Sequence, residues 1–137
     1  MRLALLIFPT HYKMKKILVL FFSLFALESF GQSKISTDSL LGNFVIDLRP
    51  TPTSEPYLKD FKFTKIYGKQ FDGEFYGYPF TGGFLNLDWD KIYFAFTTAD
   101  QSGIYFHSGY IEGNKVFGLS LNESRKFVLP WKGERKR

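Results

Sequence analysis

The feature that most constrains this chain is a run of short aromatic segments from Lys91 to Trp131, separated by turns rich in Gly, Asn and Asp. β-branched and aromatic residues dominate these segments, and such residues favour strands. The connections hold three to five residues, which suffices only for antiparallel neighbours, because a parallel crossover needs about a dozen. The run therefore predicts a β-meander. Its strands are expected at residues 91–98, 104–111, 115–120 and 125–131.

The part of the chain before Asp90 repeats this pattern. Strands are expected at residues 42–49, 60–67, 71–78 and 84–87, with a turn at 79–83. The segment from Pro50 to Pro56 is expected to be a long loop, because proline donates no hydrogen bond to a sheet. Gly73 and Gly77 are expected to make room for bulky neighbours or to mark bulges. No window of residues 33–137 has a sustained 3.6-residue apolar period, so little or no helix is predicted.

Eight short antiparallel strands have two usual arrangements, a closed up-and-down barrel and a β-sandwich. Sequential short hairpins favour the barrel, and closure also removes sheet edges that would promote aggregation of so aromatic a chain. The predicted fold is therefore all-β, an antiparallel eight-stranded meander closed into a small barrel, with the sandwich as the alternative. One barrel domain is expected over residues 42–131, after a lead-in at 32–41. A barrel of this size holds side chains or one small ligand.

The start of the first expected strand, Gly42-Asn43-Phe44, resembles the Gly-x-Trp signature of the calycin group, which includes lipocalins, fatty-acid-binding proteins and avidins. Phe44 stands where the signature has Trp. In that group an arginine from the last strand packs across the signature ring, and the resemblance implies this role for Arg125. It also implies a calycin-like ligand-binding barrel, with the ligand left open.

Residues 1–31 have the pattern of a signal peptide. Lysines at 13, 15 and 16 precede an 11-residue apolar run at 17–27, and small residues at 29 and 31 fit cleavage before Gln32. Met14 is a natural start, which makes residues 1–13 a candidate for a spurious extension. The alternative is a membrane anchor, but the apolar run is shorter than the roughly 20 residues that span a bilayer. We expect export to the periplasm or beyond in a bacterium, and no membrane span after cleavage.

Charge and cysteine content narrow the classes of partner. The whole chain has 18 Lys and Arg against 13 Asp and Glu, but residues 33–137 hold 14 against 12. Residues 132–137, with four positive charges and one negative, are expected to form a basic tail. Residues 33–137 are thus nearly neutral in net charge, and nucleic acid is not an expected partner. The chain has no cysteine, which excludes disulfides and cysteine-based metal sites.

Few residues suggest catalysis. His107 is the one histidine after the leader, and no Ser or Cys nucleophile motif accompanies it. It shares a strand face with Tyr105, so a cross-strand or cavity hydrogen bond is expected for it. Two carboxylate pairs, Asp88 with Asp90 and Asp72 with Glu74, suggest a cation site or a glycosidase acid–base pair; the alternative is solvated turn residues.

The candidates for ligand binding are amphipathic rings together with one arginine. If several rings line one cavity mouth they can stack on a flat or apolar ligand, and otherwise they are core and cross-strand pairs. Arg125 is expected either to cover the barrel or to anchor an anion; it is placed on a strand, as are Asp47 and Arg49. The candidate ligand-binding residues are Tyr76, Tyr78, Trp89, Tyr93, Tyr105, His107 and Arg125.

The sequence therefore predicts a secreted barrel that binds a small apolar or aromatic ligand, with no enzymatic activity, cofactor or metal. The alternative is an envelope protein with a filled barrel, whose outer face or Pro50–Pro56 loop meets a protein partner. A glycan-directed hydrolase is the third class. Interior volume separates the first two, because a binder should hold a pocket of roughly 300 Å³ or more.

Overall fold

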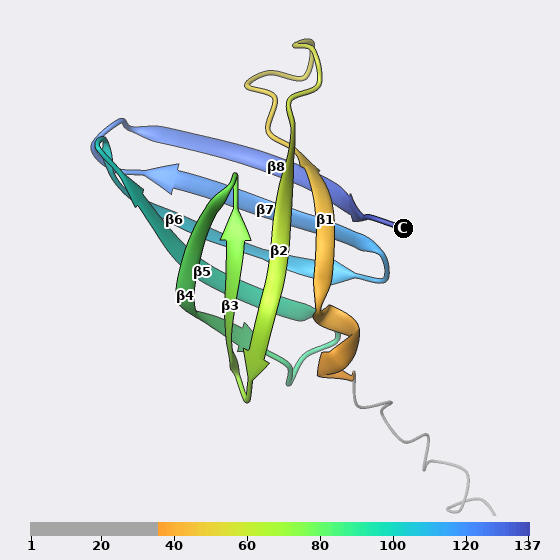
Figure 1. Cartoon of the computed structure of the whole chain (residues 1–137). Helices are drawn as coiled ribbons and strands as arrows, with labels where there is room; N and C mark the ends of the chain where they lie inside the picture. Colours follow the sequence, from red (N-terminus) through yellow and green to blue (C-terminus); the bar gives the residue numbers. More distant parts are fainter. Residues whose placement is uncertain (1–35) are drawn as a thin grey trace, which may run out of the picture. The chain divides into compact units, whose positions relative to one another are not determined.

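The structure, a computed structural model, describes residues 36–137; the predicted signal peptide at 1–31 lies outside the described residues. Each strand pairs antiparallel with the next, and the eighth pairs with the first, so the sheet closes into an up-and-down barrel (Figure 1). The predicted all-β, eight-stranded barrel is confirmed. The strands are β1 (Gly42–Asp47), β2 (Leu58–Tyr67), β3 (Gln70–Phe75), β4 (Tyr78–Asn86), β5 (Ile92–Asp100), β6 (Gly103–Glu112), β7 (Lys115–Asn122) and β8 (Phe127–Arg135).

The connections alternate between two ends of the barrel. The β1–β2, β3–β4, β5–β6 and β7–β8 connections lie at one end, called the open end here. The β1–β2 loop is the longest of the four and extends beyond the barrel at the top of Figure 1. The other three connections and a short 3-10 helix, η1 (Thr37–Leu40), lie at the opposite, closed end. Within residues 36–137 no helix is long and apolar enough to cross a membrane.

The β3–β4 turn differs from the prediction. β3 ends at Phe75, and Tyr76 and Gly77 alone make the turn, with φ of 57° and 83°. Left-handed conformations at both positions are typical of two-residue hairpin loops, whose twist matches the flanking strands. The predicted turn at 79–83 is wrong, because these residues belong to β4. Gly77 therefore serves the turn instead of a bulge.

Gly73 has the predicted role. The register of β3 against β4 shifts between Phe71 and Gly73. A Cβ atom at Gly73 would lie 2.6 Å from a ring carbon of Phe80, which is closer than real side chains approach. The absent side chain therefore makes room for an aromatic ring inside the barrel.

The end of β8 closes the barrel, so the predicted basic tail at 132–137 is wrong up to Arg135. Residues 132–135 pair with residues 44–47 of β1. Lys132 and Glu134 are exposed, whereas Gly133 lies opposite Ile46. Gly133, the inward position of this segment, thus has no apolar side chain. The sequence therefore lacks the alternation of apolar and polar residues that normally indicates a strand.

An aromatic cluster fills the closed half of the barrel. Phe61, which is fully buried, lies at its centre, with six other aromatic rings within 6.4 Å between centroids. Aromatic pairs of this kind contribute about 0.5–1.5 kcal/mol each beyond burial of area. The rings around Phe61 belong to Phe44, Phe63, Phe75, Phe94, Phe96 and Trp131.

An arginine covers this cluster at the closed end, but it is Arg135 and not Arg125. The guanidinium carbon of Arg135 lies 4.6 Å from the centre of the Phe44 ring. Its Nη1 donates a hydrogen bond to the carbonyl of Leu41, 3.1 Å away, directly after η1. The packing of Arg125 across Phe44 is therefore a wrong prediction, because β8 continues four residues beyond Trp131. Arg125 lies in the β7–β8 connection, at the open end, and not on a strand.

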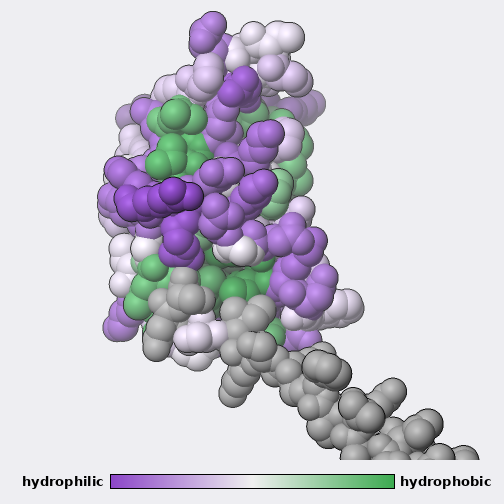
Figure 2. Space-filling model, turned by 90° about the vertical axis from the view of Figure 1, so that its right-hand side faces the viewer, coloured by the Kyte–Doolittle hydropathy of each residue, from purple (hydrophilic) through white to green (hydrophobic). Residues whose placement is uncertain are grey.

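The outer surface is mixed. In Figure 2 hydrophilic residues cover most of the visible face, and hydrophobic residues gather in separate patches. A further group of exposed apolar side chains lies on the outer wall of β6, β7 and β8, where Leu121 is opposite both Phe106 and Val128.

Candidate functional site

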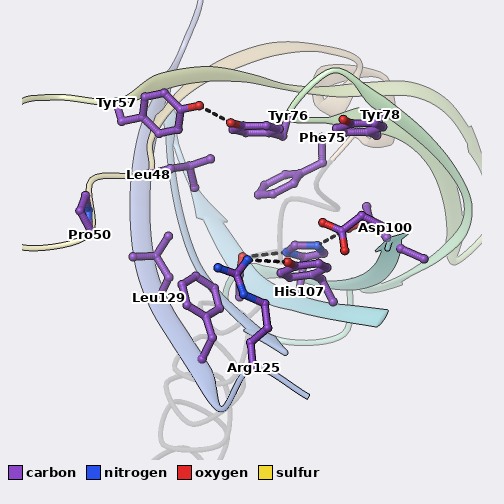
Figure 3. A pocket seen from close by; sticks show the side chains of 15 residues that line it. Leu48, Pro50, Tyr57, Phe75, Tyr76, Tyr78, Asp100, His107, Arg125 and Leu129 are labelled. Atoms are coloured by element: carbon purple, nitrogen blue, oxygen red, sulfur yellow. Dashed lines mark hydrogen bonds between the residues drawn. The ribbon is translucent and has the colours of Figure 1, made fainter. Parts of the chain in front are cut away.

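A cavity of about 450 Å³ occupies the open half of the barrel (Figure 3). Its lining comes from the β1–β2 loop, from the hairpin of β3 and β4 with its turn, from the four strands β5 to β8, and from the β7–β8 connection. The aromatic cluster ends beneath it, and Phe75 belongs to both the cluster and the cavity lining. The barrel is therefore filled at one end and hollow at the other.

The floor of the cavity carries a line of hydrogen-bonded polar groups. The Nδ1 atom of His107 lies 2.7 Å from the Oγ of Ser120, and its Nε2 lies 2.9 Å from the Oγ1 of Thr98. The Nε1 of Trp131 donates to Ser120 Oγ over 2.8 Å. These contacts span β5, β6, β7 and β8. They confirm the expectation of cross-strand hydrogen bonds for His107.

Burial shifts the charge state of His107. The residue is 4% exposed, and its ring stacks on Phe96 with centroids 4.6 Å apart. Phe75 lies on it at 4.4 Å. Desolvation in these surroundings lowers the pKa of His107 from 6.5 to about 4. The imidazole is therefore neutral at pH 7, with one nitrogen a donor and the other an acceptor.

The Ser120–His107 pair has the spacing of a nucleophile with its base, but its surroundings disfavour that chemistry. Trp131 donates a hydrogen bond to the Ser120 oxygen, which withdraws electron density from it. The other imidazole nitrogen contacts the Thr98 hydroxyl, where a triad has a carboxylate. A base with a pKa of about 4 is also a weak proton acceptor at neutral pH. The pair fits a structural role and a binding role better.

Above the floor the wall is apolar. Leu48, at the start of the β1–β2 loop, and Leu129, on β8, line it together with Phe127. Leu129 lies on the same face of β8 as Trp131, whereas Val128 points outward and is 63% exposed. A ligand entering this space would exchange water for hydrocarbon on most sides.

Tyrosines surround the mouth. Figure 3 shows Tyr57 and Tyr76 turned toward each other over the cavity, and their hydroxyls form a hydrogen bond. This bond lowers the pKa of Tyr57, joins the β1–β2 loop to the β3–β4 turn, and crosses the opening. The rings of Tyr76 and Tyr78 lie parallel within 5°, with centroids 6.3 Å apart. The Nζ of Lys59 lies 4.7 Å from the centre of the Tyr57 ring.

The β1–β2 loop is shaped by one carboxylate. Asp47 accepts hydrogen bonds from the Nε of Arg49 at 2.7 Å and from the backbone N–H of Tyr57 at 3.1 Å. The side-chain hydrogen bonds from Arg49 hold the pKa of Asp47 below its ordinary value. Arg49 also donates to the carbonyl of Ser54. Asp47 ends β1 and Arg49 lies just beyond it, so both serve the loop that carries Leu48 and Pro50 to the cavity.

Among the described residues that line the cavity, the charged side chains are those of Arg125 and Asp100, which lie at its mouth. Arg125 donates to the hydroxyl of Tyr105 over 2.9 Å, and its guanidinium carbon lies 5.7 Å from the centre of the Phe127 ring. Both charged residues are exposed to solvent. The rim is thus polar while the interior is apolar above a hydroxyl-bearing floor.

The structure brings together five of the seven predicted ligand-binding residues: Tyr76, Tyr78, Tyr105, His107 and Arg125 line the cavity. Trp89 does not, because it lies in the β4–β5 connection at the closed end and is 68% exposed. Tyr93 alternates with the inward Ile92 and Phe94 and packs outside the barrel against Tyr110, with ring centroids 6.0 Å apart.

Thr98 and Ser120 also line the cavity, but no local sequence pattern indicated them. The signal for Ser120 is the tight β6–β7 turn, because pairing Ile111 with Val116 places His107 opposite Ser120. Thr98 lies opposite Tyr105, one inward position along β5 from the partner of His107. Register, and not any local motif, brings these groups together.

The predicted carboxylate pairs have local partners. Asp88 forms an ion pair with Lys69, and Glu74 one with Lys62 at 2.8 Å. Asp72 accepts hydrogen bonds from the hydroxyl of Tyr67 and the N–H of Gly82. Within residues 36–137 no three His, Cys, Asp or Glu side chains converge as metal ligands.

Comparison with known proteins adds no relative: no family model, no curated protein and no solved structure matches this chain.

Proposed function

We propose that the protein binds a small apolar or aromatic molecule in the open half of its barrel. The observation that carries this proposal is the cavity of about 450 Å³, above the roughly 300 Å³ that a small-molecule site needs. Its apolar wall supplies binding energy through burial, and its few polar groups at floor and rim supply orientation. A barrel stabilised only by packing would gain from filling this space with side chains, as it does around Phe61.

The proposal includes no catalytic step. Both nitrogens of His107 are engaged by hydroxyls, and its low pKa suits a fixed hydrogen-bonding group better than a proton carrier. We therefore place the protein among binding proteins and not among hydrolases.

We also propose that the protein is exported. The support is the signal-peptide pattern of residues 13–31 in the sequence. Amino-terminal sequencing of the protein from its own host tests it. A mature chain that begins at Gln32 supports export, whereas a mature chain that retains Met14 overturns it.

We also propose that the resemblance to the calycin group includes the closed end of the barrel, with Arg135 taking the role first expected of Arg125. The support is the sequence Gly42-Asn43-Phe44 together with the guanidinium of Arg135 on the Phe44 ring. A Cβ atom at Gly42 would lie 3.0 Å from Nη1 of Arg135, so glycine leaves space for this arginine.

The test of ligand binding is a fluorescence titration with N-phenyl-1-naphthylamine, an uncharged dye that brightens in apolar surroundings. The variant Leu129→Trp fills the cavity from its wall, and Val128→Trp adds the same ring to the outer face one residue away. We expect Leu129→Trp to weaken binding by at least about tenfold, since an occupied volume cannot also hold the dye. Val128→Trp should bind like the unchanged protein. Equal binding by both variants, or none by the unchanged protein, would contradict the proposal.

One observation favours the alternative of a barrel that acts through protein contacts: the exposed apolar side chains on the outer wall of β6 to β8. Phe106, Leu121 and Val128 lie opposite one another there, and each is more than a third exposed. The same titration separates the two functions. A dye that binds this wall is unaffected by Leu129→Trp and responds to Val128→Trp.

A further inference from the structure

The polar floor of the cavity contains one more hydrogen-bond donor than it uses internally. Trp131, Ser120, His107 and Thr98 form a single line joined by three hydrogen bonds. With a neutral imidazole the line contains four polar hydrogens: one indole N–H, one imidazole N–H and two hydroxyl hydrogens. Each of the three hydrogen bonds uses one of these hydrogens, so one polar hydrogen is not donated to any group within the line.

The position of that hydrogen depends on the tautomer of His107, but its existence does not. Trp131 always donates to Ser120, because the indole N–H is never an acceptor. If Ser120 donates to Nδ1, then Nε2–H donates to Thr98, and the Thr98 hydroxyl hydrogen is left. If Nδ1–H donates to Ser120, then Thr98 donates to Nε2, and the Ser120 hydroxyl hydrogen is left. In both cases the remaining donor is a hydroxyl of a residue that lines the cavity.

The surroundings give this hydrogen no acceptor of their own. In the described part of the chain, the side chains of Thr98 and Ser120 make only the bonds of this line. The rings of Phe75 and Phe96 both pack against His107, with centroids 4.4 Å and 4.6 Å from that of the imidazole. A buried donor without a partner costs about 1–3 kcal/mol.

The charges at the site lie away from the floor. Arg125 and Asp100 are both exposed at the rim, with opposite signs. The floor itself faces aromatic rings and leucines, where an unpaired anion would lose its hydration without a compensating cation. An occupant whose inner end is neutral therefore fits this floor better than a carboxylate or phosphate.

We propose that the cavity selects an uncharged, largely aromatic molecule with a hydrogen-bond acceptor, such as a ketone or ether oxygen, at its inner end, where a hydroxyl of Thr98 or Ser120 donates to it. This inference rests on the proposed function, because it names the ligand class of the same cavity. The apolar wall holds the body of the molecule, and the tyrosines at the mouth cover its outer end.

Three probes of similar shape test the proposal by competition with N-phenyl-1-naphthylamine: 2-acetylnaphthalene, 2-ethylnaphthalene and 2-naphthoate. The ketone has the acceptor, the hydrocarbon lacks it, and the carboxylate adds a charge. We expect the ketone to bind about tenfold more tightly than the hydrocarbon, since the hydrocarbon buries the hydroxyl without a partner. The carboxylate should bind more weakly than the ketone. The carbonyl stretching band of the bound ketone should lie at lower frequency than in hexane.

Variants locate the donor. Thr98→Val alone should keep the preference for the ketone. Three polar hydrogens and two hydrogen bonds then remain in the line, so one donor is still unused: the Ser120 hydroxyl or the Nε2–H of His107, depending on the tautomer. The quadruple variant Thr98→Val/His107→Phe/Ser120→Ala/Trp131→Phe removes every donor of the line, including the indole N–H that loses its acceptor when Ser120 is replaced, and should prefer the hydrocarbon. The infrared band is measured on the unchanged protein, so the test does not depend on the folding of the quadruple variant.

The outcomes separate this inference from the function on which it rests. If none of the three probes binds, ligand binding in the cavity is itself contradicted. If ketone and hydrocarbon bind equally, or the hydrocarbon binds more tightly, the cavity is a binding site but the acceptor rule is wrong. If 2-naphthoate binds most tightly, the requirement for an uncharged ligand is wrong.

Discussion

The guanidinium of Arg135 lies on the ring of Phe44, with 4.6 Å between its central carbon and the ring centre, and so joins the last strand to the first at the closed end. Arg135→Ala should lower the free energy of unfolding by about 1–2 kcal/mol, because it removes this contact and the hydrogen bond to Leu41. Arg125→Ala is the matched control, since Arg125 is exposed at the open end. Urea unfolding measures both. A larger loss for Arg125→Ala would contradict the assignment.

The buried imidazole makes stability depend on pH. The pKa of His107 is lowered to about 4 in the folded chain, against an ordinary 6.5, so the unfolded chain binds the extra proton between these values. The contribution is fully present above pH 6.5 and is lost as the pH falls toward 4, amounting to about 3 kcal/mol in full. Urea unfolding of the unchanged protein should therefore show a steeper loss over this range than His107→Phe.

The carboxyl groups of Asp47 and Asp72 do not alter the comparison of pH profiles between the unchanged protein and His107→Phe. Hydrogen bonds lower both pKa values from an ordinary 3.8, so their contributions are also lost as the pH falls, but mainly below pH 4. Both groups are present in the protein and in His107→Phe alike. Parallel pH profiles for the two proteins between pH 4 and 6.5 would contradict the neutral state of His107.

The tyrosine pair at the mouth should control exchange of ligand. Tyr57→Phe removes the hydroxyl that bonds to Tyr76 and so frees the β1–β2 loop from the β3–β4 turn. We expect association and dissociation rates of N-phenyl-1-naphthylamine to rise together, by up to about tenfold, with little change in affinity. Stopped-flow fluorescence measures the rates. Tyr67→Phe is the control, since the hydroxyl of Tyr67 bonds to Asp72 at the closed end. If Tyr67→Phe raises the two rates as much as Tyr57→Phe does, the Tyr57–Tyr76 pair does not control ligand exchange.

Gly118 tests the packing of the aromatic cluster. A Cβ atom at this position would overlap the six-membered ring of Trp131. Gly118→Ala should therefore destabilise the protein by about 1–3 kcal/mol. Trp131→Phe provides a smaller ring, so the double variant should lose less stability than the sum of the two single variants. Simple additivity of the unfolding free energies would show that the two side chains do not compete for space.

Much of the fold was predictable because the strands are short, alternating and separated by tight turns. Phe94 and Phe96 on β5, for example, have inward positions that their spacing indicates. The turn at Tyr76 and Gly77 was missed because tyrosine rarely adopts a positive φ, whereas the Gly and Pro residues at 79–83 are common in turns. The end of β8 was missed because charged residues alternate there with Gly133.

The site was predictable as a set of residue types and less so as an arrangement. Tyr76, Tyr78 and Tyr105 were found because amphipathic rings favour cavity mouths. Trp89 has the same chemistry, but only the topology places it at the other end of the barrel. The hydroxyl of Ser120 carries no local signal, since its role follows from its register opposite His107.

The most direct test of ligand binding in the barrel is a set of intermolecular nuclear Overhauser effects between N-phenyl-1-naphthylamine and methyl groups of the protein. Leu48 and Leu129 line the cavity, whereas Leu121 and Val128 lie on the outer wall. The account predicts contacts from the dye to the methyl groups of Leu48 and Leu129 and none to the outer pair. Contacts to Leu121 and Val128 alone would show that the dye binds the outer wall, and would contradict a ligand-binding barrel.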